Sequence, residues 1–239
     1  METEFLYFGS DYIVVALGQH HAYVDGVSTK LVPAFDSIEA EAERYAEEEY
    51  QRFSQMPSWD GGPDLEDFAE QAFDSSVERY SSLMFVKGEL IGFATGGLYH
   101  LWEKTLKSFL FLEFSKINLD GFVRKRIERS DFNALVQWLR EWGFQEGEHS
   151  TIDLLDTCRL VANTVKHGEG VSCRELAKKA PELFRGSWDL ELPFGEPNYE
   201  DLWIDPTKFD EFAKAIESFW REFPECFRVP PSFFEHKLR

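Results

Sequence analysis

Apolar residues recur at steps of three and four positions through most of this 239-residue chain. Because an α-helix turns once every 3.6 residues, this spacing places apolar side chains along one face of a helix. Neither an internal repeat nor a low-complexity linker separates the periodic segments. The sequence therefore predicts a single all-α domain built as a multi-helix bundle. The segments cover residues 33–56, 65–88, 98–116, 132–142, 152–170 and 206–223.

Local signals place several ends of these helices. Asp131 and Asp205 each stand directly before a periodic segment, where a carboxylate accepts a hydrogen bond from the first free backbone N–H groups. Ser172 and Glu175 have the spacing of a capping box, which predicts a short helix that closes near Pro181. These signals divide the bundle into helices of ordinary length.

A glycine-rich stretch leaves one junction open to two interpretations. Either a helix ends near Lys87, or the small residues allow a neighbouring element to pack closely. The segment 98–116 that follows is the most hydrophobic of the chain, which predicts a central buried helix. Residues 32–239 are thus predicted to form one helical domain that ends in an amphipathic helix. The glycines are Gly88, Gly92, Gly96 and Gly97.

Residues 1–31 form an N-terminal segment of uncertain structure. Aromatic and β-branched residues at 5–8 and 12–17 fit a short strand pair, and a buried helix fits nearly as well. His20 and His21 point apart on either structure, and no neighbouring ligand completes a metal site. We expect a solvated loop at these histidines.

The chain carries a net charge of −19 from 44 acidic and 25 basic residues. Such a surface repels phosphate backbones at long range, which argues against constitutive, non-specific binding to nucleic acid. A local basic site remains compatible with it, because salt screens exposed charges beyond about 10 Å. The densest basic cluster fits either an RNA-steering surface or the neutralisation of nearby carboxylates, and we favour the second interpretation. It consists of Arg124, Lys125, Arg126 and Arg129.

Cysteine usage and the N-terminus indicate the compartment. Cys158, Cys173 and Cys226 are odd in number and too widely spaced for a metal motif or a disulfide framework, which indicates a reducing cytosol. The N-terminus lacks the basic region of a signal peptide, and no apolar run is long enough to cross a bilayer. We expect a cytoplasmic protein without membrane contact, metal or cofactor.

The segment 152–170 is where the sequence predicts chemistry. At 100° per residue, Leu154, Cys158, Val161 and Val165 form a narrow apolar stripe. Gly168 and Gly170 then end the helix. A polar row lies nearly opposite the stripe and consists of Asp156, Arg159, Asn163, Lys166 and His167.

This polar row has the groups that metal-independent RNA cleavage needs. A histidine exchanges protons near neutral pH, and an arginine stabilises charge on a phosphorane-like transition state. Arg159 and His167 are eight positions apart, about 12 Å along a helix at 1.5 Å per residue. One phosphate fits poorly between them in one chain. Two copies packed about a two-fold axis bring the Arg of one near the His of the other, so a catalytic site predicts a homodimer.

The run from Arg159 to Gly168, with Asn163 and His167 between, resembles the signature of the HEPN superfamily. Members are all-helical, and many are metal-independent endoribonucleases of toxin–antitoxin, CRISPR-linked and anti-phage systems that work as dimers with a composite site. The resemblance implies that Arg159 and His167 are catalytic and that Asn163 orients the phosphate or the histidine. Seven residues separate Arg159 from His167, one more than the family's usual range of four to six.

Lys166 and Glu103 are predicted supporting residues. Glu103 on the buried helix needs a cationic partner, which is either Arg159 or Lys107 four residues along its own helix. The first functional hypothesis is a possible endoribonuclease that cleaves RNA in bacterial defence or in a toxin–antitoxin pair. The alternative is a non-catalytic acidic protein of the antitoxin or immunity type, whose helical scaffold binds a defence partner.

Overall fold

The computed structural model describes residues 3–55, 65–117, 120–145, 151–184 and 198–235. Over these residues the fold is all-α, as predicted, apart from a two-stranded antiparallel sheet of β1 (Glu4–Tyr7) and β2 (Cys226–Val229). None of the described helices is long and apolar enough to cross a membrane. The α-helices are α1 (Ser10–Gly26), α2 (Ile38–Ser54), α3 (Leu65–Ile117), α4 (Gly121–Glu128), α5 (Phe132–Glu141), α6 (Thr151–His167), α7 (Val171–Lys179) and α8 (Pro206–Arg221). A π-helical turn covers Val27–Leu31, and 3-10 turns cover Val32–Phe35, Pro181–Leu183, Tyr199–Asp201 and Pro231–Phe233.

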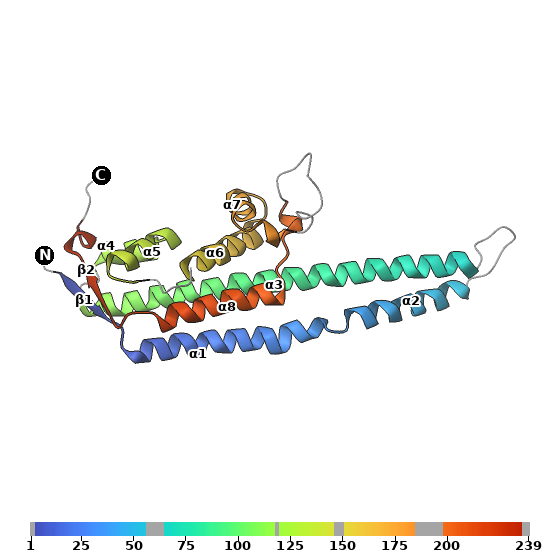
Figure 1. Cartoon of the computed structure of the whole chain (residues 1–239), viewed down its shortest axis with the longest axis horizontal. Helices are drawn as coiled ribbons and strands as arrows, with labels where there is room; N and C mark the ends of the chain where they lie inside the picture. The colour runs from blue at the N-terminus through green and yellow to red at the C-terminus, as the bar shows by residue number, and fades with distance from the viewer. Residues whose placement is uncertain (1–2, 56–64, 118–119, 146–150, 185–197, 236–239) are drawn as a thin grey trace.

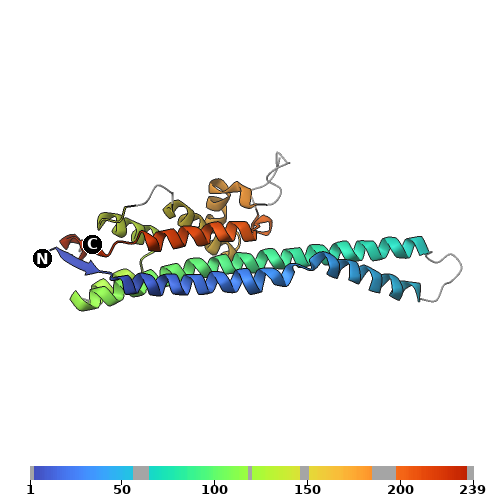
Figure 2. The same ribbon diagram turned by 60° about the horizontal axis from the view of Figure 1, so that its bottom comes forward.

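The helices form a body with a projecting arm. Helix α3 has 53 residues, which makes it about 80 Å long at 1.5 Å per residue. Its C-terminal half lies in the body beside α1, α6 and α8, whereas its N-terminal part extends outward with α2 alongside it (Figures 1 and 2). We call α2 and residues 65–87 of α3 the arm.

The glycine-rich stretch does not end a helix, because α3 runs through it without a break. A Cβ on Gly88 would lie 2.3 Å from the ring of Trp203, and one on Gly97 would lie 2.2 Å from the hydroxyl of Tyr23. A Cβ on Gly96 would be 3.5 Å from the backbone of Ala162 in α6. Close packing against neighbours is therefore the correct interpretation, and a helix end near Lys87 is wrong.

The predicted central helix is confirmed in the C-terminal half of α3. Leu98, Trp102, Leu106, Leu110 and Phe114 are each at most 1% exposed. The Trp102 ring meets Phe219 of α8 edge to face at 5.3 Å between centroids. Burying each such side chain contributes roughly 1.5–3 kcal/mol relative to leaving it in water, so this half of α3 anchors the body.

The N-terminal residues join the same body. In β1, Leu6 is fully buried, and the Phe8 ring that follows packs on Phe227 of β2 at 5.5 Å. Helix α1 contains both histidines for which we expected a solvated loop, and that expectation is wrong. His20 is only 3% exposed, while His21 faces solvent and lies 3.3 Å from Glu217 of α8.

Two of the predicted caps are confirmed and one is wrong. The carboxylate of Asp131 accepts a hydrogen bond from the N–H of Ala134 at 2.9 Å, and Asp205 accepts one from Lys208 at 2.8 Å. Helix α7 starts at Val171 instead, so Ser172 lies inside the first turn and does not cap it. The short helix α4 was not predicted. Its cap is Asp120.

Candidate functional site

Helix α6 is buried on most sides, and the predicted polar row lies on its partly exposed surface, as does Asp153. The helix packs on α3, α7 and α8. Of the predicted apolar stripe, Cys158 and Val161 are fully buried, whereas Leu154 and Val165 are only partly buried. Gly168 ends the helix with a φ of +68°, a conformation that favours glycine, and its N–H donates to the carbonyl of Thr164 at 2.8 Å. The polar row thus stands on a helix whose other sides are packed in the core.

Arg159 is held by an acidic neighbour on its own helix. Its Nε lies 2.9 Å and its Nη2 lies 2.8 Å from Oδ1 of Asp156. The other carboxylate oxygen of Asp156 accepts a hydrogen bond from Lys179 of α7 at 2.7 Å, and Lys179 also lies 2.9 Å from Asp153. This network joins α6 to α7.

The network controls the ionisation of Asp156. Burial alone would raise the pKa of this carboxyl, but hydrogen bonds from Lys179 and Arg159 outweigh it and hold the pKa below its ordinary value. The carboxylate is therefore charged at neutral pH. Its single negative charge is shared between Arg159 and Lys179.

Arg159 and Asn163 line a small pocket of about 180 Å³ between α3, α5 and α6, which we call the central pocket. The Arg159 guanidinium lies 5.7 Å from the centroid of the Phe132 ring, at the start of α5. The pocket therefore brings Arg159 and Asn163 together within one chain, whereas the spacing along the helix alone favours Asn163 and His167 as the close pair. The other lining residues are Tyr99, His100, Glu103, Asp131, Phe132 and Asn133.

Glu103 pairs along its own helix rather than with Arg159. Its Oε1 lies 3.0 Å from the Nζ of Lys107, which also donates to the carbonyl of Ser130 at 2.7 Å. The other oxygen of Glu103 is 3.6 Å from Nδ1 of His100. Of the two partners considered for Glu103, Lys107 is the correct one.

His100 is a candidate acid–base group that sequence reasoning missed. It lies in α3, 59 positions before Arg159, and enters the pocket only because α3 packs against α6. The only sequence signal for this role is the spacing of three positions between His100 and Glu103, which places the two side chains next to each other on a helix. A histidine beside a carboxylate is a common arrangement for proton transfer.

His167 lies away from the central pocket. It is exposed at the C-terminus of α6, as is Lys166, and neither side chain lines the pocket. Within the described part of the chain, His167 has no hydrogen-bond or ion-pair partner. A single chain thus brings Arg159 and Asn163 together but leaves His167 two turns from Arg159, about 12 Å along the axis.

The remaining chemistry near this face is limited. Among the described residues, no group of three His, Cys, Asp or Glu side chains is placed to hold a metal ion. Cys158 lies behind Arg159, and complete burial raises the pKa of its thiol well above the ordinary value, so it remains an unreactive thiol. The central pocket itself is lined by two carboxylates, Glu103 and Asp131, besides the Arg159 cation.

No family model, curated protein or solved structure matches this chain.

Proposed function

We propose that the protein is a HEPN-like, metal-independent endoribonuclease whose active site is composed of the α6 faces of two copies. The observation that carries the proposal is the distribution of the motif on α6. Arg159 and Asn163 line the central pocket, whereas His167 is exposed and unpaired in the described part of the chain. A catalytic role for all three residues requires the histidine of a second copy.

Each residue of the motif has a role that its surroundings suit. Asp156 occupies one N–H on Nε and one on Nη2 of Arg159, so of the five N–H donors of the guanidinium the two on Nη1 and one on Nη2 remain for a phosphate oxygen. Asn163 orients that phosphate from the next turn. His167 is exposed at the C-terminus of α6, where it can reach a second copy and act as the general acid for the leaving oxygen.

The experiment is RNA cleavage in EDTA by the purified protein and by His167→Ala. Loss of a general acid costs about 10²- to 10⁴-fold, so we expect the variant to lose at least a hundredfold. The matched control is His21→Ala, because His21 is also exposed but lies on α1. Equal cleavage by the wild type and His167→Ala contradicts the proposal.

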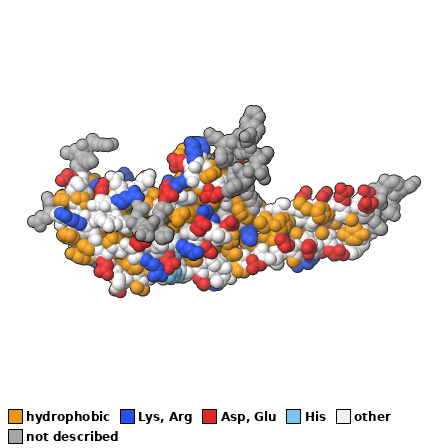
Figure 3. Space-filling view, viewed as in Figure 1, with side chains coloured by type: hydrophobic (Ala, Val, Ile, Leu, Met, Phe, Trp, Pro, Cys, Tyr) orange, Lys and Arg blue, Asp and Glu red, His pale blue; other side chains and the backbone are white. Residues whose placement is uncertain are grey.

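A second candidate function, binding of a basic protein partner as an antitoxin or immunity protein does, is favoured by the arm. On α3, Phe73 is 64% exposed and Val77 is 47% exposed, beside the carboxylates of α2. Figure 3 shows apolar and acidic side chains intermixed over this arm. Large exposed apolar groups rimmed by charge are typical of protein-binding surfaces.

The test of this second function is retention of a basic protein during purification. We expect Phe73→Glu with Val77→Glu to lose a partner that the wild type retains. The matched control is Val14→Glu with Val15→Glu, because both valines are exposed on α1 in the body. Equal retention by both double variants contradicts a role for the arm, and RNA cleavage that depends on His167 favours the first function.

A further inference from the structure

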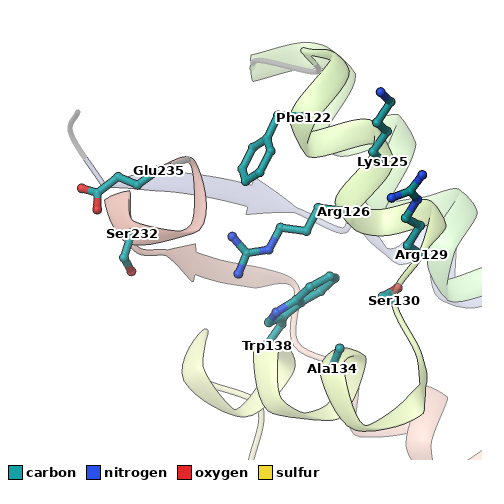
Figure 4. A pocket seen from close by; sticks show the side chains of 9 residues that line it. All are labelled: Phe122, Lys125, Arg126, Arg129, Ser130, Ala134, Trp138, Ser232 and Glu235. Carbon is teal, nitrogen blue, oxygen red and sulfur yellow. The ribbon is translucent and has the colours of Figure 1, made fainter. Parts of the chain in front are cut away.

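A second pocket lies away from the α6 face, between α4, α5 and the turn Pro231–Phe233. Its volume is about 530 Å³, within the range of ordinary small-ligand sites. We call it the basic pocket. It is lined by Phe122, Lys125, Arg126, Arg129, Ser130, Ala134, Trp138, Ser232 and Glu235 (Figure 4).

The charge of this pocket is opposite to that of the whole chain. Three cations line it against one carboxylate, Glu235, in a protein of net charge −19. Lys125 and Arg129 are exposed and have no ion pair within the described residues, and the same holds for Arg124 beside them. The interpretation that this cluster neutralises nearby carboxylates is therefore not supported for these three cations.

Arg126 occupies the centre of the basic pocket and is fixed there. Its Nη1 donates to the carbonyl of Phe233 at 2.8 Å, and its guanidinium lies 4.4 Å from the centroid of the Phe233 ring. Figure 4 shows it extending between Phe122 and Trp138, toward Ser232. One hydrogen bond leaves most of its donors free. Burial lowers the pKa of Arg126, so the protein holds this charge at a cost that a bound anion would reduce.

The walls of the pocket are apolar and flat. The ring of Phe122 is half-buried, and the Trp138 ring lies 5.3 Å from the Arg126 guanidinium. Ala134 completes this wall from α5. Aromatic rings and guanidinium planes are the surfaces on which nucleobases stack. An inorganic anion alone would engage the cations of the pocket but would make no use of these flat surfaces.

We propose that the basic pocket binds a nucleoside monophosphate unit, with its phosphate on Lys125 and Arg129 and its base stacked against Phe122 and Arg126. The unit is either a free nucleotide or one residue of an RNA chain, since both present the same phosphate and base. This inference stands independently of catalysis on α6, because the two sites share no lining residue.

Calorimetric titration of the full chain with AMP, adenosine, inorganic phosphate and an RNA trinucleotide tests the proposal. We expect AMP or the trinucleotide to bind at least about tenfold more tightly than adenosine or phosphate. Only AMP and the trinucleotide carry both a phosphate for the cations and a base for the flat walls. Tighter binding of the trinucleotide than of AMP identifies an RNA chain as the source. Absence of binding, or equal binding of phosphate alone, overturns the proposal.

Variants assign the binding to this pocket. We expect Lys125→Ala with Arg129→Ala to weaken AMP binding at least about tenfold, since each removes a charged hydrogen-bond donor. The matched control is Lys178→Ala with Lys214→Ala, which removes the same charge from exposed positions on α7 and α8. An equal loss in both double variants shows a general charge effect and overturns the assignment.

Discussion

The central pocket and the basic pocket use their cations in different ways. Arg159 at the central pocket contacts Asp156 through two nitrogens, and Asp156 in turn contacts Lys179. Lys125 and Arg129 at the basic pocket have no such partner among the described residues. Both sites flank the junction of α4 and α5. In so acidic a chain, local pairing decides whether a cation stabilises the fold or remains available to a ligand.

The largest stability effect is expected at Asp156. Replacing it with Ala removes the charged hydrogen bond to Lys179 of α7 and leaves the partly buried Arg159 unpaired, while Lys179 keeps only Asp153. Hydrogen bonds to charged groups contribute about 1.5–3 kcal/mol, so we expect a loss of about 2 kcal/mol in the free energy of unfolding. Urea denaturation measures it. A loss below about 0.5 kcal/mol would show that the network is not structural.

Replacing Arg126 should lower the stability less than replacing Asp156. Among the cations that line the basic pocket, Arg126 is the one that contacts the rest of the fold, through Phe233. Arg126→Met keeps the aliphatic stem but loses the hydrogen bond to the carbonyl of Phe233 and the stacking on its ring. We expect a loss of about 1–2 kcal/mol by urea denaturation. Arg124→Met is the control, because Arg124 is exposed and unpaired within the described residues. An equal effect of both changes would remove the distinction between them.

Acid should weaken the Asp156 network selectively. The pKa of Asp156 is lower in the folded protein than in the unfolded chain, so its contribution is complete above the unfolded value of about 3.9 and is lost as pH falls through the folded value. We therefore expect the stability difference between the wild type and Asp156→Asn to shrink as pH falls below about 3.9. Urea denaturation between pH 7 and strong acid measures this difference. A difference that stays constant with pH contradicts the assignment.

The smallest stability effect is expected at the unpaired cations. Lys125→Ala and Arg129→Ala should each change the free energy of unfolding by less than about 0.5 kcal/mol, as surface changes without partners do. The same denaturation series tests them. A loss near that of Asp156→Ala would reveal that these cations are structural after all, and the contrast between the two pockets would fail.

Local signals in the sequence were sufficient for much of this arrangement. Short-range patterns predict the caps at Asp131 and Asp205 and the end of α6 at Gly168. The helical period predicts the polar row on α6. Asp156 was placed on that row, but its bond to Arg159 was not predicted, because spacing alone does not select among several possible partners. The same limit applied to Glu103, for which two partners remained open.

Features that depend on distant segments could not be read from the sequence. His100 enters the central pocket through the packing of α3 on α6, and the basic pocket needs the C-terminal turn at Phe233 to cover α4. The strand β2 pairs with β1 from the opposite end of the chain. The unbroken helix α3 also depends on its neighbours, because Trp203 and Tyr23 fill the space beside Gly88 and Gly97.

The composite site on α6 can be tested most directly by mixing two inactive variants. Arg159→Ala and His167→Ala are purified separately, shown to be dimeric by light scattering, and then combined under conditions that allow exchange. If the Arg of one copy works with the His of the other, mixed dimers carry one intact site, and random exchange restores about a quarter of the wild-type RNA cleavage. A mixture that remains as inactive as its components, although dimers exchange, contradicts the composite site.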